Sequence, residues 1–274
     1  MRPFSERQPQ IAFLLGKPVR ATSVLSEVFD HLRSVSVAMT VDLPKGDTPV
    51  PPRLFDAELV VQRGLGLPEL GAALTLEHAG VRCCNPIAAT IALRNRAWII
   101  QTLAAAGVPV PATVPATTWP ELRDLAAGHP VVVKAADGVI GRGHGVLIAA
   151  TGHLPSRAPF AGPYILQDYV RDDNRVYKVY AVGGHAIGVA KRWPPHQTTD
   201  EAGQLFPVNS ELTELSYRAG TALDMEIYGV DILYGSNGPV VIDINPFPGF
   251  RGIPHAGQVI GSHLEAIVKG QNLR

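Results

Sequence analysis

The sequence VVIDINPFPGF at residues 240–250 follows a second apolar run, YGVDILY at residues 228–234, after a short turn. Both runs are rich in β-branched and aromatic residues and are separated by Ser, Asn and Gly, so they predict two strands of a hairpin. On a strand, residues two apart face the same side, so Asp243 and Asn245 project together. Asp231 interrupts the neighbouring apolar run in the same way.

Carboxylates in an apolar hairpin predict a cation site. A buried carboxylate is costly unless it is paired or bound to a cation. Asp231 and Asp243, with the amide oxygen of Asn245, form a set of hard oxygen ligands that suits Mg²⁺ bridging the phosphates of a nucleotide. The alternative is that one aspartate is a cap and the other forms a salt bridge, and the two strands alone leave both interpretations open.

A glycine-rich hairpin is predicted earlier, in VVVKAADGVIGRGHGV at residues 131–146. Lys134 ends an apolar strand and is expected to point into a site. Gly141, Gly143 and Gly145 let backbone N–H groups approach phosphates closely. A Rossmann fingerprint is disfavoured, because its glycines open a helix whereas a strand resumes here. The segment therefore predicts a lid over a triphosphate, with an ordinary glycine-rich turn as the alternative.

A third segment, ILQDYVRDDNRVYKVYAVGGHAIGVAKR at residues 165–192, combines a short strand with a hairpin around Gly183-Gly184. The residues after the short strand are expected to present backbone groups to the edge of an adenine base: Gln167, Asp168, Tyr169 and Val170. The hairpin carries cations that could face the same cavity: Lys178, Lys191 and Arg192. A solvated surface cation is the alternative for each of these three.

The rest of the chain predicts an α/β fold with three lobes. Strand and helix signals alternate up to about residue 80, as in a small parallel α/β unit, with one strand expected at residues 35–39. Asn85 and Pro86 predict the start of a helix that Gly107 ends, and the GVPVPAT segment that follows is non-helical because of its prolines. We therefore expect lobes at residues 1–107, 108–170 and 171–274.

Two more helix starts are visible. Thr118 and Glu121 have the spacing of a capping box, in which each side chain bonds the backbone of the other end of the first turn. Ser210 is expected to cap a helix over residues 211–224.

The composition limits the possible partners. Lys plus Arg equals Asp plus Glu at 24 each, so no basic face indicates nucleic acid or a membrane surface. Cys83 and Cys84 are adjacent, and neighbouring cysteines rarely meet disulfide geometry. The apolar run at residues 11–15 is too short for a signal sequence or a membrane span. We therefore expect a cytoplasmic protein with two free thiols and a small-molecule substrate, of unknown oligomeric state.

These segments, in this order, resemble the ATP-grasp superfamily. The resemblance covers about residues 83–253, and the run Asp-Ile-Asn-Pro-Phe-Pro-Gly-Phe is its most specific part. It implies an N-terminal parallel α/β lobe and two β-rich lobes that enclose the nucleotide. It also implies an enzyme that uses ATP with Mg²⁺, for which Mn²⁺ could substitute.

The resemblance assigns roles to matching positions. Contacts to ATP are expected from Arg96, Lys134, Gly141, Gly143, Gln167, Asp168, Tyr169 and Val170. Metal ligands are Asp231, Asp243 and Asn245, and catalytic cations are Lys178, Lys191 and Arg192. Apart from the resemblance, substrate contacts are expected from cations and a turn histidine elsewhere in the chain: Lys17, Arg63, His144 and Arg251. Two positions depart from the family pattern, because ligases more often have Lys where Arg96 stands and Glu where Asp243 stands.

Two reactions remain open on this scaffold. If the ATP γ-phosphoryl group goes to a carboxylate, an acyl phosphate forms and an amine converts it to an amide; if it goes to a hydroxyl, the enzyme is a kinase. The overall layout and GVPVPAT resemble the RimK-type carboxylate–amine ligases. Four features resemble the inositol phosphate kinases: Tyr177-Lys178-Val179, LFPVNS at residues 205–210, Arg96, and VIDINPFPGF at residues 241–250.

We favour the ligase, because ligases are the broader group among ATP-grasp proteins of this size. An inositol polyphosphate would also require a dense cationic pocket, and this chain is neutral and poor in lysine. A kinase acting on an inositol-phosphate-like or polyol hydroxyl is the alternative.

Overall fold

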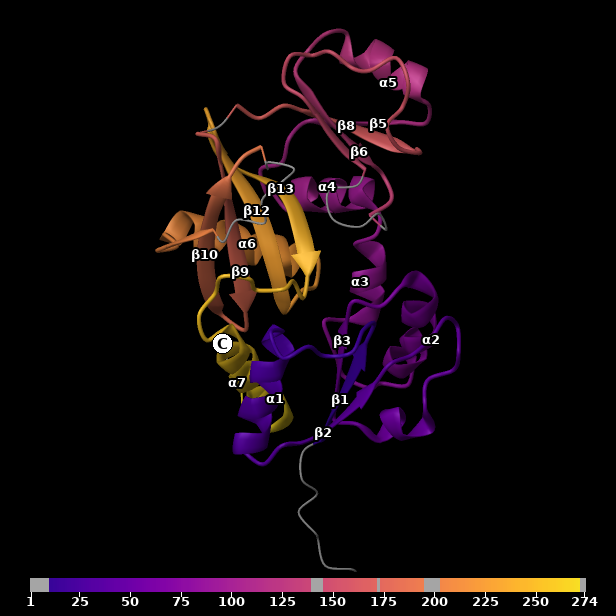
Figure 1. The fold of residues 1–274 in the computed structure, drawn as a ribbon, viewed down its shortest axis with the longest axis vertical. Coiled ribbons are helices and arrows are strands. Elements are labelled where there is room, and N and C mark those ends of the chain that lie inside the picture. Colours follow the sequence, from indigo (N-terminus) through magenta and orange to yellow (C-terminus); the bar gives the residue numbers. More distant parts are fainter. Residues whose placement is uncertain (1–9, 139–144, 172, 195–202, 272–274) are drawn as a thin grey trace, which may run out of the picture.

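The computed structural model describes residues 10–138, 145–171, 173–194 and 203–271 as three sheets joined by helices. The N-terminal lobe lies at one end of the molecule, a sheet of central residues lies at the other end, and the C-terminal sheet lies between them (Figure 1). None of the helices in these residues is long and apolar enough to cross a membrane. The expected α/β fold is confirmed.

The N-terminal lobe is a four-stranded parallel sheet in the order β2-β1-β3-β4. Its strands are β1 (Gln10–Leu15), β2 (Ala38–Asp42), β3 (Leu59–Arg63) and β4 (Cys83–Cys84). They are connected by α1 (Val24–Ser34), the 3-10 helix η1 (Pro52–Asp56) and α2 (Leu67–His78). This arrangement confirms the predicted parallel α/β unit.

Strand β2 begins later than the predicted residues 35–39. The N–H groups of residues 35–37 bond to carbonyls of residues 31–33 and so complete the end of α1. Ser36 adopts a positive φ of 58° in this turn. The β-branched residues at 35 and 37 therefore form the turn that ends α1, and the strand starts only at Ala38.

The single helix predicted from Asn85 to Gly107 is wrong, because two helices occupy this segment: α3 (Ile87–Ala92) and α4 (Arg96–Ala105). Asn95 caps α4 by accepting a hydrogen bond of 3.0 Å from the N–H of Trp98. Helix α3 follows Pro86, and its first N–H groups, those of Ile87 and Ala88, bond to the carboxylate of Glu77. The predicted cap at Asn85 is therefore also wrong.

Asn85 instead joins the two ends of the chain. Its buried side chain accepts hydrogen bonds from the N–H groups of Glu226 (2.8 Å) and Ile227 (2.7 Å). Its amide nitrogen donates to the carbonyl of Ile227 at 2.6 Å. The backbone carbonyl of Asn85 accepts from Gln62 of β3 at 3.4 Å. One amide side chain thus holds the N-terminal lobe against the start of a C-terminal strand.

The central sheet is antiparallel, with the order β5-β8-β6-β7. Its strands are β5 (Thr113–Ala116), β6 (Val131–Ala135), β7 (Val146–Ala149) and β8 (Tyr164–Asp168). Helix α5 (Trp119–Ala126) covers it and begins with the predicted capping box of Thr118 and Glu121. The hairpin of β6 and β7 confirms the two predicted strands around the glycine-rich segment.

The C-terminal sheet is antiparallel and has the order β11-β10-β9-β12-β13. Its strands are β9 (Arg175–Val182), β10 (His185–Arg192), β11 (Gln204–Phe206), β12 (Ile227–Gly235) and β13 (Gly238–Pro246). The predicted turn at Gly183-Gly184 is confirmed, with φ values of 49° and 91°. Helix α6 (Ser210–Ala222) is capped by Asn209, not by Ser210 as predicted, because Asn209 accepts from the N–H of Leu212 at 2.9 Å.

A last helix, α7 (Ala256–Val268), returns to the N-terminal lobe and lies beside α1 (Figure 1). Its residues Ile260 and Leu264 share one hydrophobic core with Leu25 and Phe29 of α1 and with Val182 of β9. No motif in the sequence marks α7, so this helix was not among the predicted elements. The boundaries predicted for the three lobes stay a prediction.

We predict that Asn85→Ala lowers the free energy of unfolding by about 3 kcal/mol, because it leaves buried N–H and C=O groups without partners. Denaturant unfolding followed by circular dichroism measures this loss. The matched control is Asn95→Ala, which removes an exposed helix cap and should cost about 1 kcal/mol. If Asn85→Ala lowers the free energy of unfolding no more than Asn95→Ala does, the Asn85 contacts do not strongly join the N-terminal lobe to β12.

Candidate active site

A row of charged residues crosses the C-terminal sheet. Lys178 on β9 is paired with Asp231 on β12, and Asp231 is paired with Asp243 on β13. Directly paired residues of antiparallel strands point to the same face of a sheet. The row therefore brings two predicted metal ligands together with a predicted catalytic lysine.

The charges in this row are coupled. Lys178 Nζ donates a hydrogen bond to Asp231 Oδ2, and the two side chains are only 25% and 16% exposed. Burial raises the pKa of Asp231. The positive charge of Lys178 lowers this pKa, and the negative charge of Asp243 offsets part of that lowering. Burial alone would lower the pKa of Lys178, but the carboxylate of Asp231 prevails and raises it. Asp231 therefore forms a salt bridge, which was the alternative to a metal site in the sequence analysis.

Lys134 reaches this row from the central sheet. It is buried near the end of β6, and its Nζ donates a hydrogen bond of 2.7 Å to the carbonyl of Ile242 on β13. The pairing of β12 with β13 shifts after Asp231, which leaves Ile242 as the extra residue of a β-bulge. Burial lowers the pKa of Lys134, and Asp243 opposes that shift.

Arg96, the first residue of α4, lies beside Lys134. Its Nη1 donates to the carbonyl of Ala135 at 2.8 Å, and its charge contributes to the lowered pKa of Lys134. A narrow cavity lies where α4, the central sheet and β13 meet. Its lining residues are Arg96, Ile99, Ile100, Leu103, Lys134, Ile165, Gln167, Ile242 and Asp243. This cavity holds only about 10 Å³, too little for a nucleotide base, so it marks the point where cations meet an apolar wall.

A second cavity of about 220 Å³ shares Arg96, Ile99 and Asp243 with the first. The guanidinium groups that line it belong to Arg63 of β3, Arg94 and Arg96, and Asn245 lies at its edge on β13. The sequence analysis missed Arg94 and the Gln62–Thr90 pair, which also lines this cavity. No local pattern marks these residues, because only the packing of the N-terminal lobe against β13 brings them here.

A family model described as the RimK-like ATP-grasp domain matches residues 93–264, a span that includes Arg96, Lys134, Asp231 and Asp243. The chain belongs to this family. The resemblance to the ATP-grasp superfamily and its RimK-type branch is thereby confirmed.

Curated relatives of this RimK-like protein are similar over most of its length. A probable alpha-L-glutamate ligase of Methanococcoides burtonii is 26% identical over 229 residues, covering 74% of this chain and 75% of that protein. Beta-citrylglutamate synthase B of Danio rerio is 30% identical over 192 residues, covering 64% of this chain and 47% of that protein.

Solved structures confirm the ATP-grasp fold. A RimK domain ATP-grasp protein from Sphaerobacter thermophilus DSM 20745 superposes with a TM-score of 0.71 at 16% identity, covering 95% of this chain and all (100%) of the other. The ATP-grasp ligase PsnB, solved with a minimal precursor, Mg and ADP, superposes with a TM-score of 0.69 at 16% identity, covering 96% and 97%.

In this RimK-like protein, the segment predicted to border adenine lies at the end of β8, where hydrogen bonds to the central sheet and its connections fix it. Gln167 is buried and donates from Nε2 to Thr113 Oγ1 at 3.0 Å. Asp168 is exposed, and its N–H bonds to the carbonyl of Ala112 at 3.0 Å. Tyr169 follows, with its N–H bonded to Pro130, and Val170 packs on the C-terminal sheet. Of these, only Gln167 lines the narrow cavity.

The remaining predicted residues are spread more widely. Lys191 is on the same face of the C-terminal sheet as Lys178, whereas Arg192 is exposed and faces the opposite side, because side chains alternate along β10. Lys17 and Arg251 are exposed and line neither cavity. Gly141, Gly143 and His144 lie outside the described residues.

The oxygen ligands in the row fit a hard cation. Asp231 and Asp243 are directly opposed, and like charges in that position repel each other unless a cation offsets them. Asn245 lies two residues beyond Asp243 on the same side of β13, and its side chain is exposed. Two carboxylates with an amide oxygen are the ligand types that Mg²⁺ takes in proteins, alongside phosphate oxygens and water.

We predict that Asp243→Asn reduces kcat by at least about 100-fold, the scale found when one group that stabilises charge in a transition state is removed. The variant should stay folded, because it relieves the repulsion with Asp231. Coupled-assay kinetics and thermal unfolding test both parts, with Asp30→Asn on exposed α1 as the control. Normal turnover in Asp243→Asn would exclude the metal role of this residue.

We predict that Lys134→Met weakens binding of a non-hydrolysable ATP analogue by at least about tenfold, since a charge-assisted hydrogen bond contributes about 1.5–3 kcal/mol. Methionine keeps most of the buried stem, so packing is largely preserved. Isothermal titration calorimetry measures the affinity, and Lys269→Met on the exposed end of α7 is the control. Equal affinities in Lys134→Met and wild type would rule out a phosphate contact.

Proposed function

We propose that this RimK-like ATP-grasp protein is an ATP-dependent ligase that joins a carboxylate to an amine as an amide. ATP phosphorylates the carboxylate, and the amine then displaces phosphate from the acyl phosphate. The products are the amide, ADP and free phosphate, so that the water formally lost in the condensation leaves with the phosphate.

The cavity of about 220 Å³ beside Asp243 and Asn245 carries this proposal. Arg94 Nη2 donates to the carbonyl of Leu65 at 2.7 Å, and Arg63 donates to the carbonyls of Phe247 and Pro248 at 3.1 and 3.3 Å. Each guanidinium has five N–H donors, and these bonds use one or two of them. The other donors suit a carboxylate, which guanidinium groups bind in a bidentate manner.

The names of the relatives support a ligase and indicate a class of amine. The relatives named alpha-L-glutamate ligase and beta-citrylglutamate synthase have names that include glutamate. We therefore infer that the amine is an amino acid, with glutamate as the first candidate. The carboxylate lies in the arginine-lined cavity, next to the row of Lys178, Asp231 and Asp243.

Two of the motifs that resemble inositol phosphate kinases contain residues with structural roles here. Tyr177 donates its hydroxyl to Asp173 at 2.6 Å and packs edge-on against Phe206 and Tyr234. In the LFPVNS segment, Phe206 takes part in this aromatic cluster and Asn209 caps α6. These contacts explain Tyr177 and the LFPVNS segment without a polyol phosphate. The named relatives are ligases or a synthase, so the kinase is not favoured.

The residues of the chain divide the work of the reaction. Lys134 and Arg96 bind phosphate oxygens, and the apolar wall with Ile99 and Ile242 excludes water from the narrow cavity. Lys178 holds Asp231 in place and offsets charge on the transferred group. Asp231, Asp243 and Asn245 would hold Mg²⁺, or Mn²⁺ as a substitute, and the ion would neutralise charge on the phosphates. Two buried, unbridged cysteines agree with a cytoplasmic enzyme.

The function is tested by incubating the protein with Mg·ATP, glutamate or other amino acids, and a panel of carboxylic acids and polyols. ADP and phosphate are measured, and products are weighed by mass spectrometry. We expect a product lighter by one water than the sum of its two organic substrates. A single substrate heavier by one phosphoryl group would contradict the ligase and establish the kinase.

We predict that Arg94→Ala raises the KM for the carboxylate substrate by at least about tenfold, because a charged pair of about 1.5–3 kcal/mol is lost. The KM for ATP should change little. The matched control is Arg218→Ala, which also removes one arginine-to-carbonyl bond, at 3.0 Å to Gly107, away from the cavity. A KM for the carboxylate that is unchanged in Arg94→Ala would contradict the assigned pocket.

A further inference from the structure

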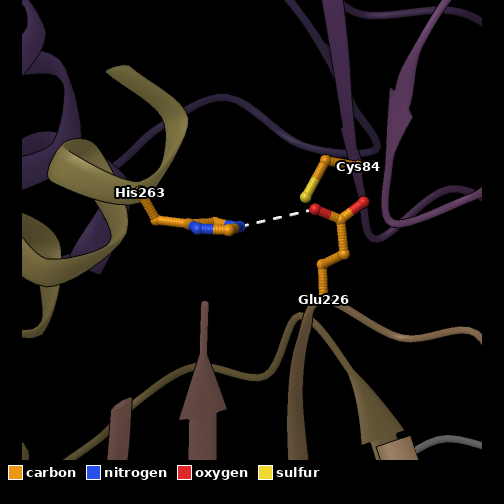
Figure 2. Close-up of side chains that lie close together, drawn as sticks. All are labelled: Cys84, Glu226 and His263. Carbon is orange, nitrogen blue, oxygen red and sulfur yellow. Dashed lines mark ion pairs between the residues drawn. The ribbon is translucent and has the colours of Figure 1, made fainter. Parts of the chain in front are cut away.

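Three side chains with metal-binding atoms meet at the junction between the lobes. Cys84 comes from β4, Glu226 directly precedes β12, and His263 comes from α7 (Figure 2). Their sulfur, oxygen and nitrogen atoms all lie within 4.8 Å of one another. None of the three lines either cavity of the candidate active site. They are therefore a separate cluster from the residues that handle ATP.

His263 lacks the partners that a buried imidazole requires. It is 7% exposed, and neither ring nitrogen has a hydrogen-bond partner among the described residues. Nε2 points toward Glu226 Oε2 at 3.5 Å, a distance for an ion pair (Figure 2). A buried polar group without hydrogen bonds is costly and calls for an explanation, such as a bound ion.

The surroundings hold each of these groups in place. A Cβ atom at Gly183 would lie 2.1 Å from Nδ1 of His263, so only glycine leaves room for the ring. Arg82 Nη2 donates to both carboxylate oxygens of Glu226, at 3.0 and 2.9 Å. The N–H of Glu226 bonds to Asn85, the residue next to Cys84. Carboxylates that bind metals are oriented by such outer contacts.

We propose that Cys84 Sγ, Glu226 Oε2 and His263 Nε2 bind one Zn²⁺ ion. Thiolate, imidazole and carboxylate are the three ligand types of protein zinc sites, and water completes a tetrahedral set. With bonds of about 2.0–2.1 Å, the nitrogen and oxygen ligands of tetrahedral zinc lie about 3.4 Å apart. The measured separation of 3.5 Å between His263 and Glu226 matches this value. Mg²⁺ does not suit the site, because it prefers oxygen ligands only.

In this position the zinc ion would link separate parts of the chain. It would connect the parallel N-terminal sheet, the start of β12 and the C-terminal helix, which also share a hydrophobic core, the Asn85 contacts and the Arg82–Glu226 ion pair. Because an ion that binds only the folded chain stabilises it by mass action, zinc should raise the unfolding temperature. This role does not depend on which two substrates the enzyme joins.

The test is titration of the tag-free, metal-stripped full chain with Co²⁺, whose bond to a thiolate gives a charge-transfer band in the near ultraviolet. We expect one Co²⁺ per chain, displaced by Zn²⁺. The matched pair of variants is Cys84→Ser and Cys83→Ser. Cys83 packs in a different core cluster from Cys84, so Cys83→Ser should keep the band while Cys84→Ser loses it.

A direct ligand should account for at least about a 100-fold change in affinity, since even outer contacts account for 10–100-fold. Zn²⁺ affinity is measured by competition with a chromophoric chelator in the same variants and in His263→Gln, which checks the site if Cys84→Ser does not fold. Asp243→Asn, at the Mg²⁺ site, should bind zinc as wild type does. A wild-type chain without stoichiometric Co²⁺ binding, or a band retained in Cys84→Ser, would overturn the proposal and leave a His263–Glu226 ion pair.

Discussion

The repulsion between Asp231 and Asp243 is the constraint around which the candidate active site is built. The two carboxylates are directly opposed on β12 and β13, in strands that are otherwise apolar. Such a pair is unstable without positive charge close by. Lys178 supplies it from β9 and Lys134 from the central sheet, each through a hydrogen bond onto this hairpin. Mg²⁺ with a nucleotide would complete the neutralisation.

The same hairpin also lines the proposed substrate cavity. Phe247 and Pro248, just beyond β13, accept hydrogen bonds from Arg63 of the N-terminal lobe, and the Arg63 guanidinium lies 5.3 Å from the centre of the Phe247 ring. Burial lowers the pKa of Arg63. Arg63 of the N-terminal lobe is thus held by hydrogen bonds to the residues that directly follow the strand carrying Asp243. The cavity depends on both lobes, as expected for an enzyme that joins two substrates next to ATP.

The sequence predicted the parts of the structure that have a local signature. The predicted hairpin brought Asp231 and Asp243 together, and the turn at Gly183-Gly184 and the capping box at Thr118 were correct. Long-range contacts decided the rest. Asn85 has the composition of a helix cap, but bonding to residues 226 and 227 fixes its role. Arg94 and the Cys84–Glu226–His263 cluster carry no motif, because they meet only in the folded chain.

We infer that the opposed carboxylates hold the cation that ATP requires. Electron paramagnetic resonance can count Mn²⁺ bound per chain in the presence of a non-hydrolysable ATP analogue, in wild type and in an Asp231→Asn, Asp243→Asn double variant. The analogue alone serves as the blank, and added Zn²⁺ excludes the cysteine cluster. The account predicts protein-bound Mn²⁺ in the wild type and its loss in the double variant. Equal Mn²⁺ binding in both proteins would contradict it.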